Sequence, residues 1–187
     1  MAPSKFSANN IKTIKHSAMV ANAARMIALR TNGIIDSDMA YMCGIFHDIG
    51  KLDLDESEKY KHPLIGYQMM IENGDKTIAE VCISHPFVTP YRTNYLECYC
   101  GNDTETLEII LDVLSTLTIT PLIRLIQFCD KISGVDKYMS IEDKFEWYRN
   151  KYNTTSNLIE TNFDAYMEIK KEIEEYIKDD VYKIVFN

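Results

Sequence analysis

The sequence is poor in residues that break regular structure, and it lacks any long apolar run. Its 7 glycines and 5 prolines among 187 residues are too few for a collagen-like or low-complexity chain. No stretch approaches 18 uncharged apolar residues, so the sequence predicts no transmembrane helix. Because 46% of the residues are hydrophobic, the chain has enough apolar material for a real core, and we expect one domain.

Positive charge is also scarce. The chain has 20 Lys and Arg against 28 Asp and Glu, which gives a formal net charge of −8. No basic cluster forms the face that a polyanion binder needs, so we expect neither long nucleic acid nor a membrane as a partner. A small phosphorylated molecule stays compatible with this charge, because a bound metal ion supplies positive charge locally.

The five cysteines are odd in number, and only Cys98 and Cys100 lie close together. Their spacing is not that of a zinc knuckle and no second pair follows, so a metal or redox role is the less favoured interpretation. Residues 1–6 contain no apolar segment of a secretory signal. We therefore expect reduced thiols and a cytoplasmic protein.

Apolar residues recur at helical spacing along nearly the whole chain, which predicts an all-α fold. The expected helices cover residues 9–31, 37–50, 63–73, 77–84, 105–116, 119–133, 140–152 and 156–178. Residues 51–61 and 86–104 lack periodicity and are expected to be loops. Only residues 181–186 have a strand pattern, and no partner strand is predicted for them.

Two aspartates lie in apolar surroundings. Asp48 follows His47 at the end of an expected helix, and Asp130 lies in an apolar helical segment over residues 122–132. A carboxylate is costly to bury unless it is paired or binds a cation. For Asp130, a salt bridge to Lys131 or Arg124 is the alternative to a metal.

The four histidines all lie in the first half of the chain. His16 is on an alanine-rich helix, where a hydrogen-bonded core histidine is the commoner explanation. His62 and His85 each precede a proline, which places them at helix boundaries, where they either line a pocket or lie on the surface. Taken together with the two aspartates, four histidines are typical of an imidazole and carboxylate metal site, with enough ligands for two ions.

The order of these residues resembles the histidine–aspartate (HD) domain of metal-dependent phosphohydrolases. The resemblance rests on His16, on Gly-Ile-Phe-His-Asp-Ile-Gly-Lys at residues 44–51, and on Asp130, over about residues 11–133. His62 and His85 resemble the subset of this family with two metals. The resemblance implies a helical bundle, and we expect a single HD domain over residues 1–187. Its core would cover about residues 9–135, followed by a C-terminal helical extension over about 138–187.

The resemblance also implies an activity. It is hydrolysis of a phosphoester or phosphoanhydride bond in a nucleotide or other small phosphorylated molecule, through a metal-activated water. The implied metal ligands are imidazoles and carboxylates: His16, His47, Asp48 and Asp130 for one ion, and Asp48, His62 and His85 for a second. Asp48 and Lys51 are the implied catalytic residues, with Lys51 neutralising a phosphate oxygen. The implied cofactors are two divalent ions, for which Fe, Mn, Co, Ni, Zn and Mg all remain open.

The expected loop over residues 86–104 directly follows a proposed ligand. Its Tyr91, Arg92, Tyr95 and Tyr99 are suited to stack a base and bind a phosphate. The alternative is that these tyrosines fold the loop onto the core.

Differences between these motifs and those of the family's subgroups narrow the range of expected substrates. Residues 66–68, Gly-Tyr-Gln, differ from the Gly-Tyr-Pro of cyclic dinucleotide phosphodiesterases, and Ile-Gly-Lys replaces the acidic pair of (p)ppGpp hydrolases. A better match is the group that splits dinucleoside tetraphosphates symmetrically, although His-Pro-Phe at residues 85–87 differs from its histidine turn.

Two other functional classes stay open: a degenerate HD module that binds a regulatory ligand, and a di-iron HD-fold oxygenase. The apolar stripe over residues 159–177 favours core packing, with a homodimer contact as the alternative.

Overall fold

The structure, a computed structural model, describes residues 8–52, 54–88, 100, 103–152 and 157–186. Within these residues the regular elements are helices, and one isolated β-bridge pairs Ser133 with Tyr138, so the predicted all-α class is confirmed. The α-helices are α1 (Ala8–Ala28), α2 (Ser37–Phe46), α3 (His62–Glu72), α4 (Lys76–Ser84), α6 (Thr104–Thr116), α7 (Pro121–Ile132), α8 (Ile141–Tyr152), α9 (Asn157–Ile177) and α10 (Val181–Val185). Two short 3₁₀ helices, η1 (Ile49–Lys51) and η2 (Glu56–Lys61), join α2 to α3.

Side-chain caps set several helix starts. The Asp36 carboxylate accepts a hydrogen bond from the Met39 backbone N–H at 2.7 Å, which begins α2 as the sequence predicts. At the start of α7, the Thr120 hydroxyl accepts from the Ile123 N–H at 3.2 Å, and Pro121 takes the first helical position. The boundaries of the longer helices thus follow from local chemistry.

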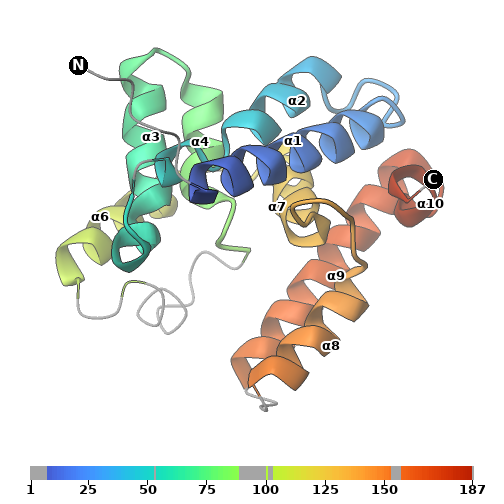
Figure 1. The fold of residues 1–187 in the computed structure, drawn as a ribbon. Coiled ribbons are helices and arrows are strands. Elements are labelled where there is room, and N and C mark those ends of the chain that lie inside the picture. The colour runs from blue at the N-terminus through green and yellow to red at the C-terminus, as the bar shows by residue number, and fades with distance from the viewer. Residues whose placement is uncertain (1–7, 53, 89–99, 101–102, 153–156, 187) are drawn as a thin grey trace.

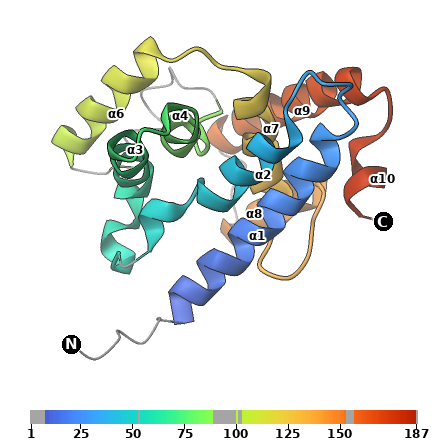
Figure 2. The ribbon, with the colours of Figure 1, turned by 90° about the horizontal axis from the view of Figure 1, so that it is seen from above.

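The helices form two groups around α7 (Figures 1 and 2). On one side, α3, α4 and α6 pack together; on the other, α8 and α9 run antiparallel and lead to α10. α1 and α2 lie side by side across the middle, and α7 contacts α1, α2, α4, α8 and α9. The helix that carries Asp130 is therefore the one on which both groups pack.

The main core follows from this arrangement. α1 contributes small side chains such as Ala23 and Ala24, which let neighbouring helices approach, and α7 contributes fully buried Phe128. The α9 stripe is buried in the same core through Tyr166, Ile169 and Ile173. Core packing of these residues is confirmed, while a homodimer stays a prediction.

Two segments differ from the sequence expectation. Residues 181–185 form α10 rather than a strand, because Asp180 caps the turn by accepting from the Tyr182 N–H at 2.9 Å. Val181 and Val185, one helical turn apart, are then both buried. The segment 51–61, expected as a loop, includes η2 and the end of η1, and its lack of apolar periodicity reflects a solvent-facing turn.

The described thiols are free. Cys43, Cys82, Cys100 and Cys129 are buried and form no disulfide among the described residues, and burial raises the pKa of Cys43 to about 12. Cys98 lies outside the described residues. Across the described part of the chain, each helix is too short or too polar to span a bilayer.

Candidate metal centre

Three buried histidines lie at the C-terminal ends of helices. They are the C-terminal caps of α2, η2 and α4, and each Nδ1 lies at hydrogen-bond distance from the backbone carbonyl three residues earlier. The three bonds are His47 to Gly44 at 2.8 Å, His62 to Lys59 at 2.7 Å and His85 to Cys82 at 2.9 Å. Because a carbonyl oxygen only accepts, each Nδ1 carries the proton, and in the neutral ring Nε2 presents a lone pair.

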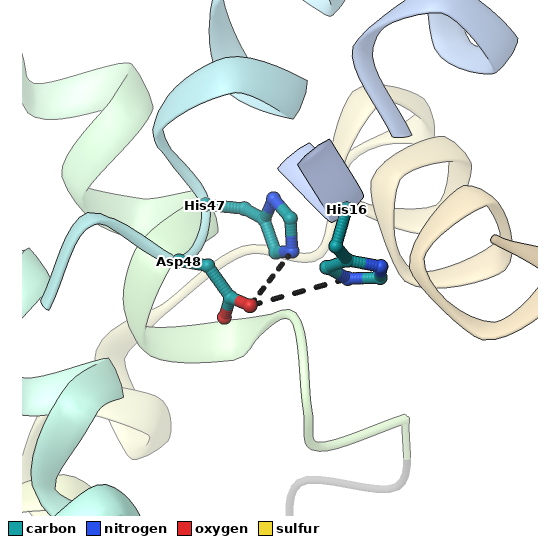
Figure 3. Close-up of side chains that lie close together, drawn as sticks. All are labelled: His16, His47 and Asp48. Atoms are coloured by element: carbon teal, nitrogen blue, oxygen red, sulfur yellow. Dashed lines mark ion pairs between the residues drawn. The ribbon is translucent and has the colours of Figure 1, made fainter. Parts of the chain in front are cut away.

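The Nε2 atoms of these rings converge on one carboxylate. Asp48 Oδ1 lies 3.2 Å from Nε2 of His62 and 3.2 Å from Nε2 of His85. Asp48 Oδ2 lies 3.5 Å from Nε2 of His47 and 3.9 Å from Nε2 of His16, which reaches in from α1 (Figure 3). The two oxygens of Asp48 therefore face two different pairs of histidines.

Asp130, on α7, joins the group formed by His16, His47 and Asp48 Oδ2. Its Oδ1 lies 2.9 Å from Nε2 of His16 and 3.6 Å from Nε2 of His47. Nδ1 of His16 lies 3.3 Å from the carbonyl oxygen of Gly134, just beyond α7. Asp130 thus pairs with His16. Neither Lys131 nor Arg124 forms a salt bridge with Asp130, which was the alternative to a metal.

Two glycines permit this convergence. A methyl group at Gly44 would collide with the backbone of Ala21, so α1 and α2 approach closely only because this residue has no side chain. A methyl group at Gly50 would collide with the carbonyl oxygen of His62. The first contact brings His16 to His47, and the second brings Asp48 to His62.

Lys51 supplies the nearest cation. Its Nζ donates to Asp48 Oδ2 at 2.6 Å, and its side chain is 27% exposed. The predicted contact of Lys51 with a substrate phosphate stays a prediction, but the ammonium group lies where it can reach both Asp48 and solvent.

The charges of the site are strongly coupled. Burial would raise the pKa of Asp48, but the positive charges of His47 and Lys51 hold that pKa well below its usual value. Burial lowers the pKa of His62 to about 4 and also lowers the pKa of His85. For His47, the effect of burial is outweighed by Asp48 and Asp130, and its pKa is raised.

The arrangement fits a divalent cation. His47 Nε2 and Asp48 Oδ1 are buried without a hydrogen-bond partner among the described residues, and Nε2 of His62 and His85 face each other at 3.2 Å. When the rings are neutral these nitrogens are acceptors, and acceptor atoms crowded in this way repel one another unless a cation lies among them. Two triplets have the spacing of metal ligands and share Asp48: His16, His47, Asp48, and Asp48, His62, His85.

The structure thus brings together all six side chains predicted from the sequence as metal ligands, and their role as ligands stays a prediction. Tyr91, Arg92, Tyr95 and Tyr99 lie outside the described residues. Sequence reasoning missed the backbone carbonyls that orient the histidines. The available signal was the position of each histidine at a helix end.

A comparison with protein families identifies the class. The family model described as "HD domain" matches residues 13–134. That span is more than half of the chain, which therefore belongs to the HD-domain superfamily of metal-dependent phosphohydrolases. Searches of curated proteins and of solved structures found no match.

Proposed function

We propose that this chain is a metal-dependent phosphohydrolase that uses two divalent ions to cleave a phosphoester or phosphoanhydride bond of a nucleotide or other small phosphorylated molecule. The proposal rests on the orientation of the Asp48 carboxylate. Its Oδ1 faces His62 and His85, and its Oδ2 faces His16 and His47. A carboxylate placed in this way is suited to bridge two metal sites.

The histidines and aspartates would hold the ions, in the two groups described above. Divalent ions in such a site activate water at neutral pH and neutralise charge on the phosphoryl oxygens. Neutral imidazoles suit this role, because protonation would compete with metal for Nε2. The lowered pKa values of His62 and His85 agree with neutral rings at physiological pH.

Lys51 would position the substrate. Its Nζ already lies 2.6 Å from Asp48, and four rotatable bonds let it turn from this carboxylate to a phosphate oxygen. In a chain of net charge −8, this lysine and the ions would provide the positive charge that an anionic substrate needs.

The proposal is tested by metal analysis of the purified protein together with a hydrolysis panel. We expect two ions per chain, and phosphate release from nucleotides or small phosphoesters when Mn, Fe, Co or Mg is supplied. His62→Ala and His85→Ala should each remove one ion and most of the activity, whereas Lys76→Ala, an exposed change at the opposite end of α4 from His85, should alter neither.

The outcomes separate the competing classes. Full metal content and activity in both histidine variants would refute the two-metal form of the proposal. Metal or ligand binding without hydrolysis of any substrate in the panel would favour a regulatory module. Tightly bound iron with oxygen consumption would favour an oxygenase.

A further inference from the structure

A second feature of the site lies on the far side of Asp130, where a pocket of about 280 Å³ opens between α7 and α8. His16 and Asp130 form one wall, and Lys131, Ser133, Lys144 and Tyr148 line the remainder. We call this the lysine pocket. Its volume is near the lower end of the range for small-molecule sites, and it shares two residues with the candidate metal centre.

The two lysines of the pocket are not neutralised by carboxylates. Among the described residues, neither Lys131 nor Lys144 forms an ion pair, whereas several other lysines do. Those paired lysines are Lys51, Lys59, Lys61, Lys76, Lys170 and Lys183. In a chain with 28 acidic residues, two lysines that line one pocket and form no ion pair among the described residues provide local positive charge.

Aromatic rings hold both ammonium groups in place. Nζ of Lys131 lies 4.8 Å from the ring centroid of Tyr166 and 5.5 Å from that of Tyr148. Nζ of Lys144 lies 5.8 Å from the centroid of Tyr148 and 5.8 Å from that of Trp147. Contacts with ring faces order an ammonium group without cancelling its charge, so the N–H donors stay available to an anion.

Ser133 adds an independent observation. Its residue is 3% exposed, and its Oγ is a buried polar atom without a hydrogen-bond partner among the described residues. A buried hydroxyl without a partner is costly, so Ser133 leaves unsatisfied hydrogen-bonding capacity next to the pocket. The one acidic group in the wall, Asp130, already pairs with His16 through Oδ1 at 2.9 Å.

We propose that the lysine pocket binds a second phosphate group of the substrate, at a distance from the phosphoryl group that is hydrolysed. The substrate would then be a molecule with two separate phosphate groups or a polyphosphate chain. This inference rests on the proposed function, because it assumes that the scissile phosphate binds at Asp48. It also uses Lys144 and Tyr148, which lie beyond the HD match that ends at residue 134.

The test compares alkane bisphosphates of increasing chain length with alkyl monophosphates of the same lengths. Binding to the metal-loaded full chain is measured by titration calorimetry at low salt, so that the readout does not require hydrolysis. We expect one chain length at which the bisphosphate binds about tenfold more tightly than its monophosphate, since each charged contact is worth about this factor. Lys144→Gln should remove that advantage and leave monophosphate affinity unchanged, and Lys144→Arg should keep it.

Lys137→Gln is the matched control. It makes the same charge change on an exposed lysine outside the pocket wall and should leave both affinities unchanged. Lys131→Gln provides a second variant with the expected loss. The inference is overturned if bisphosphates show no advantage at any length, or if Lys144→Gln and Lys137→Gln weaken binding equally. A bisphosphate advantage without hydrolysis of any substrate would support the pocket and contradict the hydrolase.

Discussion

Single residues of the site combine one buried carboxylate, that of Asp48, with three histidines whose rings are oriented by backbone carbonyls. Histidine and aspartate in apolar contexts already indicated a cation, because an unpaired carboxylate is costly to bury. The protonation of each ring was not predictable, because it depends on which carbonyl each Nδ1 meets. For His47 that carbonyl belongs to Gly44, and the bond exists only once the turn has formed.

Lys51 allows a test of the proposed division of roles between metal ligands and substrate contacts. Lys51→Met should lower kcat/KM about a hundredfold, because removing one charged donor from a developing phosphoryl charge costs roughly this factor. Metal content should stay at the wild-type value, since Lys51 pairs with Asp48 as a cation and offers no lone pair to a metal ion. Steady-state kinetics and metal analysis check the two parts, with Lys76→Met as the control. Loss of metal in Lys51→Met would contradict this assignment.

At the scale of elements, helix positions followed from periodicity, and the exceptions have physical reasons. Residues 181–186 are rich in β-branched and aromatic side chains, so their composition fits a strand, yet no strand lies beside them among the described residues. The Asp180 cap and the burial of Val181 and Val185 favour a helix instead. The close approach of α1 and α2 at Gly44 was also not predictable, because it depends on the position of Ala21 in space.

The contact at Gly44 predicts whether Gly44→Ala stabilises or destabilises the fold. Helix propensity alone would make Gly44→Ala stabilising by about 1 kcal/mol. The new methyl group would instead meet the backbone of Ala21, which cannot move aside as a side chain can, so we expect destabilisation by about 2 kcal/mol. Metal affinity should fall as well, because His16 and His47 would separate.

Urea unfolding and metal titration measure these two effects. Met42→Ala, on the exposed face of the same helix, should change the free energy of unfolding by less than about 0.5 kcal/mol. Stabilisation by Gly44→Ala would show that α1 and α2 have room to separate, and that their packing does not require a glycine at this position.

At the scale of the whole molecule, the site depends on segments far apart in the chain. His16 and Asp130 are 114 residues apart, and the helix of Asp130 carries the packing of α8 and α9. The residue types predicted that His16 and Asp130 belong to one metal site, and the resemblance to a family assigned them to the same ion. It did not predict that α8 would form one side of a pocket at the same site.

Metal should therefore stabilise the whole fold. An ion at a concentration a hundred times its dissociation constant adds about 2.7 kcal/mol to the free energy of unfolding if the unfolded chain does not bind it. Chelation should lower the melting temperature of the wild type, and Mn²⁺ should restore it. Asp48→Asn, which removes the charge shared by both sites, should abolish the response. An equal response in wild type and Asp48→Asn would place the stabilising ion elsewhere.

The carbonyl bonds of the three capping histidines have a further consequence. Each ring is oriented by its own turn of backbone, so the chemical identity of each donor atom is determined within four residues of chain. Tertiary packing then determines only the distances between the Nε2 atoms of these histidines. Substitutions elsewhere in the molecule can tune the spacing of this centre without altering which atoms it offers, and its donor set can persist while the surrounding sequence changes.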